Sequence, residues 1–490
     1  DYNTTDISDH TLRSVYLPPF KAALDAGAAT VMSAFNDLNG VPASGNRSTL
    51  TGILRQEWGW DGLVVSDYTS VAELVNHGVA ADGKDAARIA LSAGVDMEMV
   101  SRLYNKHGAE LVKEGKLSLA SVDEAVKRVL RAKFRAGAFE RPYAVEGAED
   151  GVLLAPAHRA LARTSAAKSM VLLKNEGVLP LSKDLGTLAV VGPWADSKAE
   201  LLGSWTGDGR ADDATTILAG VRAAVGPKTL VSTSTAGADA VVVVVGESAT
   251  MSGEASSRSS LDLPEGQLEL LQAVKATGKP FVVVLLTGRP LALPWLAENV
   301  PALLLAWQPG TEGGRAVADV LFGAENPGGK LPASFPRSVG QVPVYYNHKN
   351  GGRPYDPNNK YTSRYLDLPN TPLYPFGFGL SYTTFALSEL SVRPAELAPG
   401  GKAEVTVSVK NTGARAGDEV VQLYIRAPAG PTTRPVRELK GFRRVTLAPG
   451  EVRRLEFVLG PEELGGPTGT YQVFAGTSSV GGLTAELRQK

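Results

Sequence analysis

The sequence predicts a multidomain protein in which two α/β segments precede an all-β domain. Its 490 residues exceed what one hydrophobic core organises, and at ~100–200 residues per domain we expect about three domains. Through residues 1–345, short apolar runs alternate with stretches of helical spacing, which indicates parallel strands joined by crossover helices. From residue 385 apolar residues recur at every second position, which indicates a β-sandwich.

The first α/β segment covers residues 1–140, and a connector over 141–155 follows it. Polar residues stand at or just after the expected strand ends, namely Asn36, Asp67 and Glu98. Such positions suit the C-terminal rim of a barrel, although about three βα units are visible and a closed barrel of this type needs eight. We expect strands over 29–35, 62–66 and 94–99, and helices over 8–25, 49–58, 85–92 and 121–136, the first and last opened by serine caps.

The second α/β segment covers residues 156–345. Most of its expected strands are continuous Val/Leu runs, as strands buried on both faces of a parallel sheet should be. We expect strands over 188–191, 229–232, 240–246, 281–287 and 302–307, and helices over 158–173, 264–277 and 313–322.

The C-terminal part begins with a long ordered linker over 346–384, rich in Asn, Pro, Gly and Tyr. Residues 385–490 then alternate apolar and polar side chains between turn signals and show no helix, which predicts a sandwich of about 100 residues. We expect its strands over 403–409, 420–426, 439–447, 452–459 and 469–475.

Composition excludes several kinds of protein. Lys plus Arg number 50 against 51 Asp plus Glu, so charge gives no reason to expect nucleic acid or an anionic membrane as a partner. The chain has no cysteine, which excludes disulfides and thiolate chemistry. Its five histidines are scattered without an H-E-x-x-H pattern, and we expect neither a metal site nor a cofactor. No apolar run approaches 18 residues, so no membrane span is expected.

Three acidic residues are candidates for catalysis. Asp67 ends an expected strand, where a carboxylate points into the mouth of a barrel; the alternative interpretation is an Asp that caps the next helix. Glu247 and Glu254 lie on a small, polar loop after a five-valine strand. Loops placed by rigid strands often carry catalytic groups, but a solvated loop with incidental acids is the alternative.

Several motifs resemble glycoside hydrolase family three, and especially its bacterial periplasmic multidomain β-glucosidases. Gly-Leu-Val-Val-Ser-Asp-Tyr (62–68) resembles the nucleophile motif of that family. Asn-Pro-Gly-Gly-Lys-Leu-Pro-Ala-Ser-Phe-Pro (326–336) and Tyr-Pro-Phe-Gly-Phe-Gly-Leu-Ser-Tyr-Thr-Thr-Phe (374–385) are specific to it. The resemblance spans essentially the whole chain. It implies the C-terminal part of a (β/α)8 barrel over 1–140, an α/β sandwich domain over 156–345 and a fibronectin type III-like β-sandwich over 385–490.

The resemblance implies a retaining mechanism with a covalent glycosyl-enzyme. Asp67 matches the nucleophile of the family, and Glu254 in Ser-Gly-Glu-Ala-Ser-Ser-Arg best fits the place of its acid/base, with Glu247 as the alternative. Retention requires the two carboxyl groups to be about 5–5.5 Å apart. We expect hydrogen-bond donors to lower the pKa of Asp67, and the anionic nucleophile to raise the pKa of Glu254.

Two aromatic residues are expected to line the substrate site. Phe35 falls where many relatives have a Tyr near the nucleophile, and Tyr68 replaces their usual Trp or His after it. Either ring could contact sugar, and ordinary packing is the alternative for both.

The implied activity is that of an exo-acting β-glucosidase, which removes terminal β-D-glucosyl residues from β-glucosides and short β-linked oligosaccharides. The alternatives are a β-xylosidase or other exo-glycosidase of the family, or a catalytically incomplete carbohydrate-binding fragment. The resemblance places about five early barrel strands before Asp1, so we expect the missing N-terminal part of the same enzyme as a partner; a homodimer is a further expectation. It also implies a periplasmic or secreted location.

Overall fold

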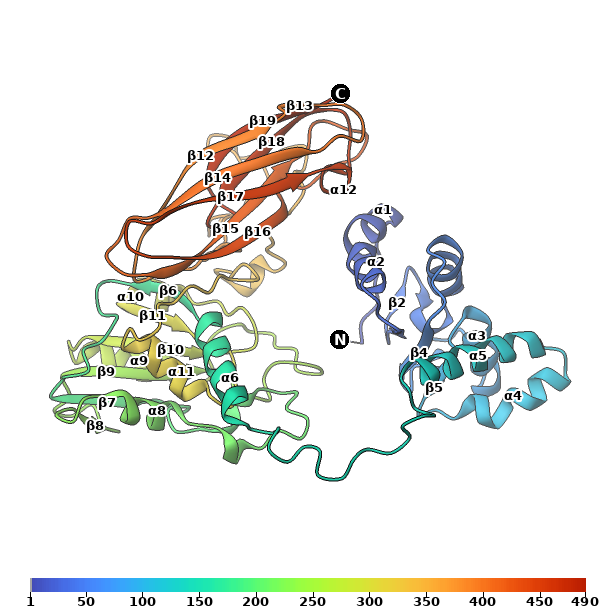
Figure 1. Ribbon diagram of the computed structural model, residues 1–490, viewed down its shortest axis with the longest axis horizontal. Coiled ribbons are helices and arrows are strands. Elements are labelled where there is room, and N and C mark those ends of the chain that lie inside the picture. The colour runs from blue at the N-terminus through green and yellow to red at the C-terminus, as the bar shows by residue number, and fades with distance from the viewer. Residues whose placement is uncertain (1) are drawn as a thin grey trace. The chain divides into compact units, whose positions relative to one another are not determined.

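The computed structural model describes residues 2–490, and the chain divides into two compact units (Figure 1). The first unit ends at Asp150 and the second begins at Gly151. An exposed stretch runs from the last helix of the first unit, which ends at Arg135, to the first helix of the second unit, which begins at Pro156. In this stretch Tyr143 is 88% exposed and Val145 is 75% exposed. This stretch includes the predicted connector.

The first unit is built on a three-stranded parallel sheet in the order β1-β4-β5. The strands are β1 (Thr30–Ser33), β4 (Leu63–Tyr68) and β5 (Met97–Met99), and all three were predicted. In the register, Ser33 pairs with Ser66. β4 extends two residues beyond its predicted end, so Asp67 and Tyr68 belong to the strand. A small hairpin is formed by β2 (Asp37–Leu38) and β3 (Val41–Pro42).

Helical segments connect the strands of this sheet and pack against it. The Ser8 cap is confirmed, because its side chain accepts a hydrogen bond from the Thr11 backbone N–H. The cap of α5 is Ser118, which accepts from the N–H of Ser121, so the prediction that α5 starts at Ser121 was wrong. The helical segments are α1 (Asp9–Thr11), η1 (Leu12–Tyr16), α2 (Leu17–Asp25), η2 (Ala43–Gly45), η3 (Ser48–Glu57), η4 (Ala72–Leu74), α3 (Gly83–Ala93), α4 (Leu103–Lys113) and α5 (Leu119–Arg135).

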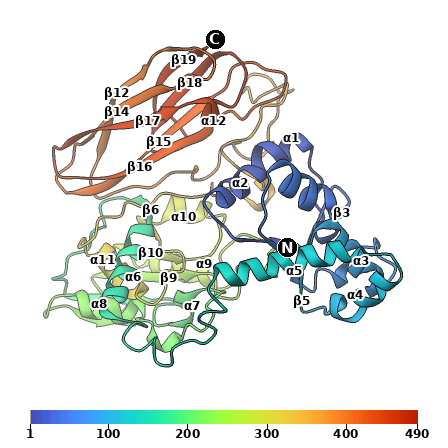
Figure 2. The same ribbon diagram turned by 45° about the vertical axis from the view of Figure 1, so that its right-hand side comes forward.

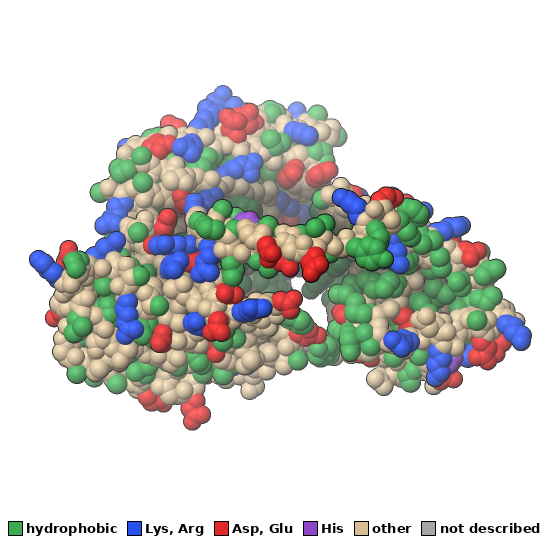
Figure 3. Space-filling model, turned by 60° about the horizontal axis from the view of Figure 1, so that its bottom comes forward, with side chains coloured by type: hydrophobic (Ala, Val, Ile, Leu, Met, Phe, Trp, Pro, Cys, Tyr) green, Lys and Arg blue, Asp and Glu red, His purple; other side chains and the backbone are tan. Residues whose placement is uncertain are grey.

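Both outer strands of this sheet leave an edge open. Within the described residues, β1 and β5 pair only with β4. Met32 on β1 is 52% exposed and Met97 on β5 is 46% exposed. Figure 3 shows hydrophobic side chains gathered on the surface of the N-terminal unit. Open edges and exposed apolar side chains are features that a completed sheet would cover.

The second unit contains a six-stranded sheet in the order β6-β11-β10-β9-β7-β8. Its strands are parallel except β6, which runs antiparallel to β11 at the edge. The strands are β6 (Val171–Asn175), β7 (Thr187–Val191), β8 (Leu230–Ser232), β9 (Ala240–Gly246), β10 (Phe281–Leu286) and β11 (Ala302–Leu305).

One predicted helix of this unit was too long. The prediction of a helix over 158–173 is wrong at its C-terminal end, because α6 (Pro156–Ser169) stops and β6 begins at Val171. Met170–Leu173 is a short apolar run, and periodicity alone does not separate such a run from a buried helical turn. The other helical segments are α7 (Ala199–Leu202), η5 (Ala211–Asp213), α8 (Ile217–Ala224), α9 (Gln267–Ala276), α10 (Pro294–Asn299), α11 (Gly313–Leu321) and η6 (Val339–Gln341).

Helices cover both faces of the six-stranded sheet (Figures 1 and 2). Val242 and Val244 of β9 point into one core, with side chains of α6, α8 and α11. Val241, Val243 and Val245 point into the other, with side chains of α9 and α10. The five valines are therefore fully buried, and β9 ends at a fixed point immediately before Glu247.

The C-terminal part of the second unit is a two-sheet β-sandwich with its own core. Its sheets have the orders β12-β14-β17 and β13-β19-β18-β15-β16. The predicted absence of helix was wrong for one turn, α12 (Pro461–Leu464). The strands are β12 (Phe385–Arg393), β13 (Glu396–Leu397), β14 (Ala403–Asn411), β15 (Gly417–Arg426), β16 (Glu438–Leu447), β17 (Val452–Leu459), β18 (Gly469–Gly476) and β19 (Leu483–Gln489).

Candidate active site

Asp67 lies near the C-terminal end of β4 and is half-buried. Its Oδ1 accepts a hydrogen bond of 2.7 Å from the Tyr68 N–H. The next helical turn, η4, has Val71 at its N-cap position and no side-chain cap. The interpretation of Asp67 as a helix cap is therefore wrong, and its carboxylate makes no ion pair within the described residues.

The backbone turns sharply after Asp67. Thr69 has φ of +59°, and Val100 and Arg102, just after β5, have φ of +70° and +56°. β-Branched residues rarely occupy this left-handed region. The turn is held by the Thr69 N–H, which donates to the carbonyl of Met99 at 3.2 Å. Backbone strain of this kind often accumulates at functional sites.

A chain of buried serine hydroxyls ends on the backbone carbonyl of Asp67. Ser33 Oγ lies 2.8 Å from Ser44 Oγ, which lies 2.8 Å from Ser70 Oγ. Ser70 Oγ donates to the Asp67 carbonyl at 3.3 Å. Because each hydroxyl has one proton, Ser44 must then donate to Ser70, and Ser33 to Ser44. The three serines are at most 4% exposed, so the chain fixes the Asp67 peptide from inside the unit.

Ser66 supports the same peptide from the side of β5. Its fully buried hydroxyl donates to the Asp67 carbonyl at 2.8 Å and accepts from the Met99 N–H at 2.8 Å. The β4–β5 register shifts between Val65 and Tyr68. The Ser66 side chain thus bridges the two strands where the regular ladder is interrupted.

The two predicted aromatic residues also lie in the N-terminal unit. Tyr68 follows Asp67 in β4 and is 58% exposed. Phe35 follows β1 and is half-buried; its ring packs edge-on against Tyr2 with centroids 5.3 Å apart. The Phe35 carbonyl lies 3.1 Å from His77 Nε2. Tyr68 is therefore free of the core, whereas Phe35 is partly held by neighbours.

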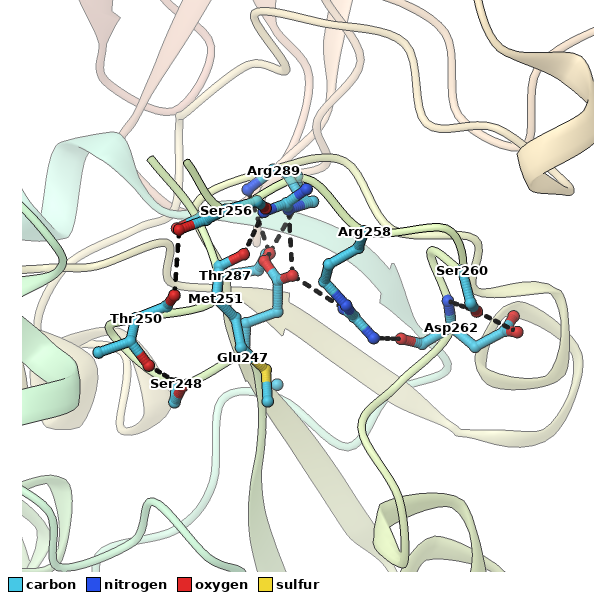
Figure 4. A network of polar contacts seen from close by, with 12 residues as sticks. Glu247, Ser248, Thr250, Met251, Ser256, Arg258, Ser260, Asp262, Thr287 and Arg289 are labelled. Carbon is cyan, nitrogen blue, oxygen red and sulfur yellow. Dashed lines mark hydrogen bonds and ion pairs between the residues drawn. The ribbon is translucent and has the colours of Figure 1, made fainter. Parts of the chain in front are cut away.

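Glu247 stands directly after β9, and its side chain is 0% exposed (Figure 4). Its Oε1 accepts a hydrogen bond from Arg258 Nη1 at 2.8 Å and forms an ion pair with Arg289 Nε at 3.1 Å. Its Oε2 accepts from the Thr287 hydroxyl at 2.8 Å. Two guanidinium groups and a hydroxyl therefore surround one buried carboxylate.

Glu254 lies on the exposed part of the loop that these arginines hold. Arg289 Nη2 donates to the carbonyls of Met251 and Ser256 on either side of Glu254, the second at 2.6 Å. Arg258 Nη2 donates to the Asp262 carbonyl at 3.1 Å. Glu247 and Glu254, two neighbouring acids in the sequence, thus have different surroundings.

Sequence reasoning missed the residues that support these carboxylates. Ser33, Ser44 and Ser70 come from three separate segments, and Arg289 follows a different strand from the loop that it binds. A single sequence contains no signal that brings them together. Arg258 is the last residue of the Ser-Gly-Glu-Ala-Ser-Ser-Arg motif, but the sequence did not predict its ion pair with Glu247.

The described residues contain neither a candidate metal site nor a candidate membrane-spanning helix. Among residues 2–490, no group of three or more His, Asp or Glu side chains is placed to hold a metal ion. Over the same residues, no helix has the length and apolar character needed to cross a membrane.

Family models match three parts of the chain. Residues 1–132 match the N-terminal domain of glycosyl hydrolase family 3, and residues 170–382 match its C-terminal domain. Residues 419–479 match a fibronectin type III-like domain. The periplasmic β-glucosidase of Salmonella typhimurium is 44% identical over 98% of this chain and 70% of that protein. The chain belongs to glycosyl hydrolase family 3. It is a glycoside hydrolase.

Other relatives and solved structures agree with this family. A β-xylosidase of Formosa agariphila is 39% identical over 94% of this chain and 68% of that protein. The structure of a Listeria innocua β-glucosidase in complex with glucose has a TM-score of 0.95 at 41% identity. It covers 100% of this chain and 71% of that one. This glycosyl hydrolase family 3 chain therefore has the predicted fold class: barrel-type α/β, α/β sandwich and fibronectin type III-like parts.

Proposed function

We propose that the chain carries the catalytic residues of a retaining, exo-acting β-glucosidase, which removes terminal β-D-glucosyl residues from β-glucosides and short β-linked oligosaccharides. The observation that carries the proposal is the Asp67 carboxylate. It lies at the C-terminal end of a parallel strand, caps no helix and makes no ion pair within the described residues. Relatives named β-glucosidase support glucose as the sugar.

The proposed reaction proceeds in two displacements. Asp67 attacks the anomeric carbon while Glu254 gives its proton to the leaving oxygen, so the glycosidic bond breaks and a glycosyl ester forms. The Glu254 carboxylate then takes a proton from water, which attacks the same carbon and releases Asp67 and the sugar. Two inversions give net retention. Tyr68 and Phe35 would contact the sugar or its leaving group through their rings.

Glu254 suits the acid/base role better than Glu247. An acid/base must exchange protons with a leaving group and with water, and Glu254 is exposed on its loop. Glu247 is fully buried, and its oxygens accept from Arg258 and Thr287.

We also propose that further strands of the same enzyme complete the sheet of the N-terminal unit. The proposal rests on the open edges of β1 and β5 and on the exposed Met32 and Met97. Backbone groups at open strand edges pair readily with another strand. Similarity to a protein named periplasmic supports a periplasmic or secreted location, which cell fractionation tests.

Kinetics of three variants of the active enzyme test the catalytic assignment. Asp67→Asn should lower kcat for aryl β-glucosides by at least about 10³-fold, since it removes the nucleophile. Glu254→Ala should slow cellobiose far more than 2,4-dinitrophenyl β-glucoside, and azide should partly restore it by replacing water. Full activity of Asp67→Asn refutes the nucleophile, and azide rescue of Glu247→Ala in place of Glu254→Ala refutes the acid/base. If the enzyme hydrolyses the corresponding aryl β-xyloside faster than the β-glucoside, its preferred sugar is xylose and the assignment of glucose is wrong.

A further inference from the structure

We infer that Glu247 is a positioning residue, which holds the loop of Glu254 through two arginines. The inference rests on the proposed acid/base role of Glu254. It gives Glu247, the other acid of this region, a distinct function. Figure 4 shows the contacts of Glu247 with Arg258 and Arg289, and those of Arg289 with Met251 and Ser256.

The loop around Glu254 is closed by one guanidinium nitrogen. Arg289 Nη2 donates to the carbonyls of both Met251 and Ser256. These residues stand three positions before and two positions after Glu254 in the sequence. Because one atom binds both ends, the short segment between them forms a loop with Glu254 near its apex.

The backbone within this loop turns tightly. Gly253 has φ of +102° and Ala255 has φ of +56°, so the residues on both sides of Glu254 are left-handed. A Cβ added to Gly253 would come within 2.5 Å of Ser204 Oγ. A conformation of this kind persists only when surrounding contacts hold it, and Arg289 supplies such contacts at both ends.

Glu247 fixes the two arginines in turn. Its Oε1 lies 2.8 Å from Arg258 Nη1 and 3.1 Å from Arg289 Nε. Both guanidinium side chains are 21% exposed, whereas the Glu247 side chain is fully buried at the end of β9. The carboxylate is therefore rigidly placed by the sheet, and it offsets part of the positive charge of its partners. Without it, two guanidinium groups would repel each other at short range.

Glu247→Gln tests this inference, because glutamine keeps the size of the side chain but removes its charge. We expect kcat/KM for cellobiose to fall by about 10²-fold, the effect of a displaced catalytic group. Azide should give no rescue, since Glu254 is still present. On the Glu254→Ala background, Glu247→Gln should change kcat/KM by less than about threefold, because residues that act as a unit are not additive.

Glu312→Gln is the matched control. Glu312 is 1% exposed and, like Glu247, pairs with two arginines, but these are Arg159 and Arg315 in place of Arg258 and Arg289. Glu312→Gln should lower Tm about as much as Glu247→Gln does, since each removes one buried charge. Its effect on kcat/KM should be the same with and without the Glu254 side chain. Arg289→Lys is a second variant, because lysine keeps the charge but cannot span both carbonyls from the same place; it should reproduce the kinetics of Glu247→Gln.

Limited trypsin digestion gives a readout that does not depend on activity. Cleavage after Arg258 should be at least about tenfold faster in Glu247→Gln than in the unchanged chain or in Glu312→Gln, because local opening controls access. Azide rescue, additive effects in the double variant or unchanged activity and cleavage would each overturn the inference. If Glu254→Ala alone shows no dependence on the leaving group, the proposed acid/base fails, while the trypsin result still decides whether Glu247 holds the loop.

Discussion

The hydroxyl of Ser70 donates a hydrogen bond to the backbone carbonyl of Asp67 at 3.3 Å. The same hydroxyl lies 2.8 Å from Ser44 Oγ. Ser44 is 1% exposed, so no bulk water replaces it when it is removed. The peptide that carries the proposed nucleophile is thus connected to the interior of its unit by buried side chains.

Ser44→Ala should therefore reduce activity without removing any group that touches sugar. The variant loses two buried hydrogen bonds, to Ser33 and to Ser70, at about 1 kcal/mol each. Loss of the Ser70 bond at the transition state alone lowers kcat by about fivefold. Ser121→Ala is the control, since its hydroxyl pairs with Ser118 at 2.7 Å on the exposed side of α5. Steady-state kinetics of both variants check the prediction. Equal activity of Ser44→Ala and the unchanged enzyme would mean that the hydroxyl chain does not position Asp67.

Asp96→Asn should destabilise the N-terminal unit. The Asp96 carboxylate, 2% exposed, accepts from Arg55 Nη2 and Arg128 Nη1 at 2.8 Å and from the Val64 N–H at 2.9 Å. Breaking a buried ion pair costs about 3–5 kcal/mol. Native-state hydrogen exchange of peptides that cover β4 and α5 measures the local opening free energy.

Asp61→Asn is the control for this variant. Asp61 also pairs with two arginines, Arg131 at 3.0 Å and Arg135 at 3.7 Å, but it is 59% exposed. Exposed pairs contribute about 0–1 kcal/mol, so the Asp61 variant should exchange almost as slowly as the unchanged chain. If both variants lose a similar amount of local opening free energy, burial does not explain the stabilisation by the Asp96 ion pairs.

Glu98 should make stability depend on pH. Burial raises the pKa of Glu98 above its usual value, against the opposing hydrogen bond from the Tyr104 N–H. A folded-state pKa above the unfolded one favours folding while the group is protonated, so this contribution is present below about pH 4.3 and is lost as pH rises through the folded pKa. Tm of Glu98→Gln minus Tm of the unchanged chain should therefore increase from pH 4 to pH 8. A constant difference over that range would show that Glu98 does not titrate in this way.

The strands that were predicted best are those buried on both faces of a sheet. Ala240–Gly246 was predicted with its observed bounds, because a run of five β-branched valines favours a strand covered on both faces. β12 was missed: its register shifts between Ser388 and Ser391, and Glu389 has φ of +56°. α4 was missed because Arg102 at its N-cap is left-handed and offers no capping side chain, so no start signal precedes it.

For the site, the sequence identified acids but not their support. Asp67 could be predicted because a carboxylate at a strand end is a local feature, and the motif around it is specific. Ser33, Ser44 and Ser70 could not, since their hydroxyls meet only after β1, η2 and the turn beyond β4 have packed together. The difference between Glu247 and Glu254 likewise depends on Arg289, which is 35 residues beyond Glu254 in the sequence and reaches the loop only through the fold.

Trapping of the covalent intermediate tests the assignment of Asp67 most directly. The active enzyme is inactivated with a 2-deoxy-2-fluoro-β-D-glucosyl fluoride, digested with trypsin and mapped by mass spectrometry. The peptide between Arg55 and Lys84 contains Asp67 together with Asp61, Glu73 and other acids, so fragment ions must locate the label. We expect one fluoroglucosyl group on Asp67 and none in Asp67→Asn. A label on Glu73 or on any other residue would contradict the assignment.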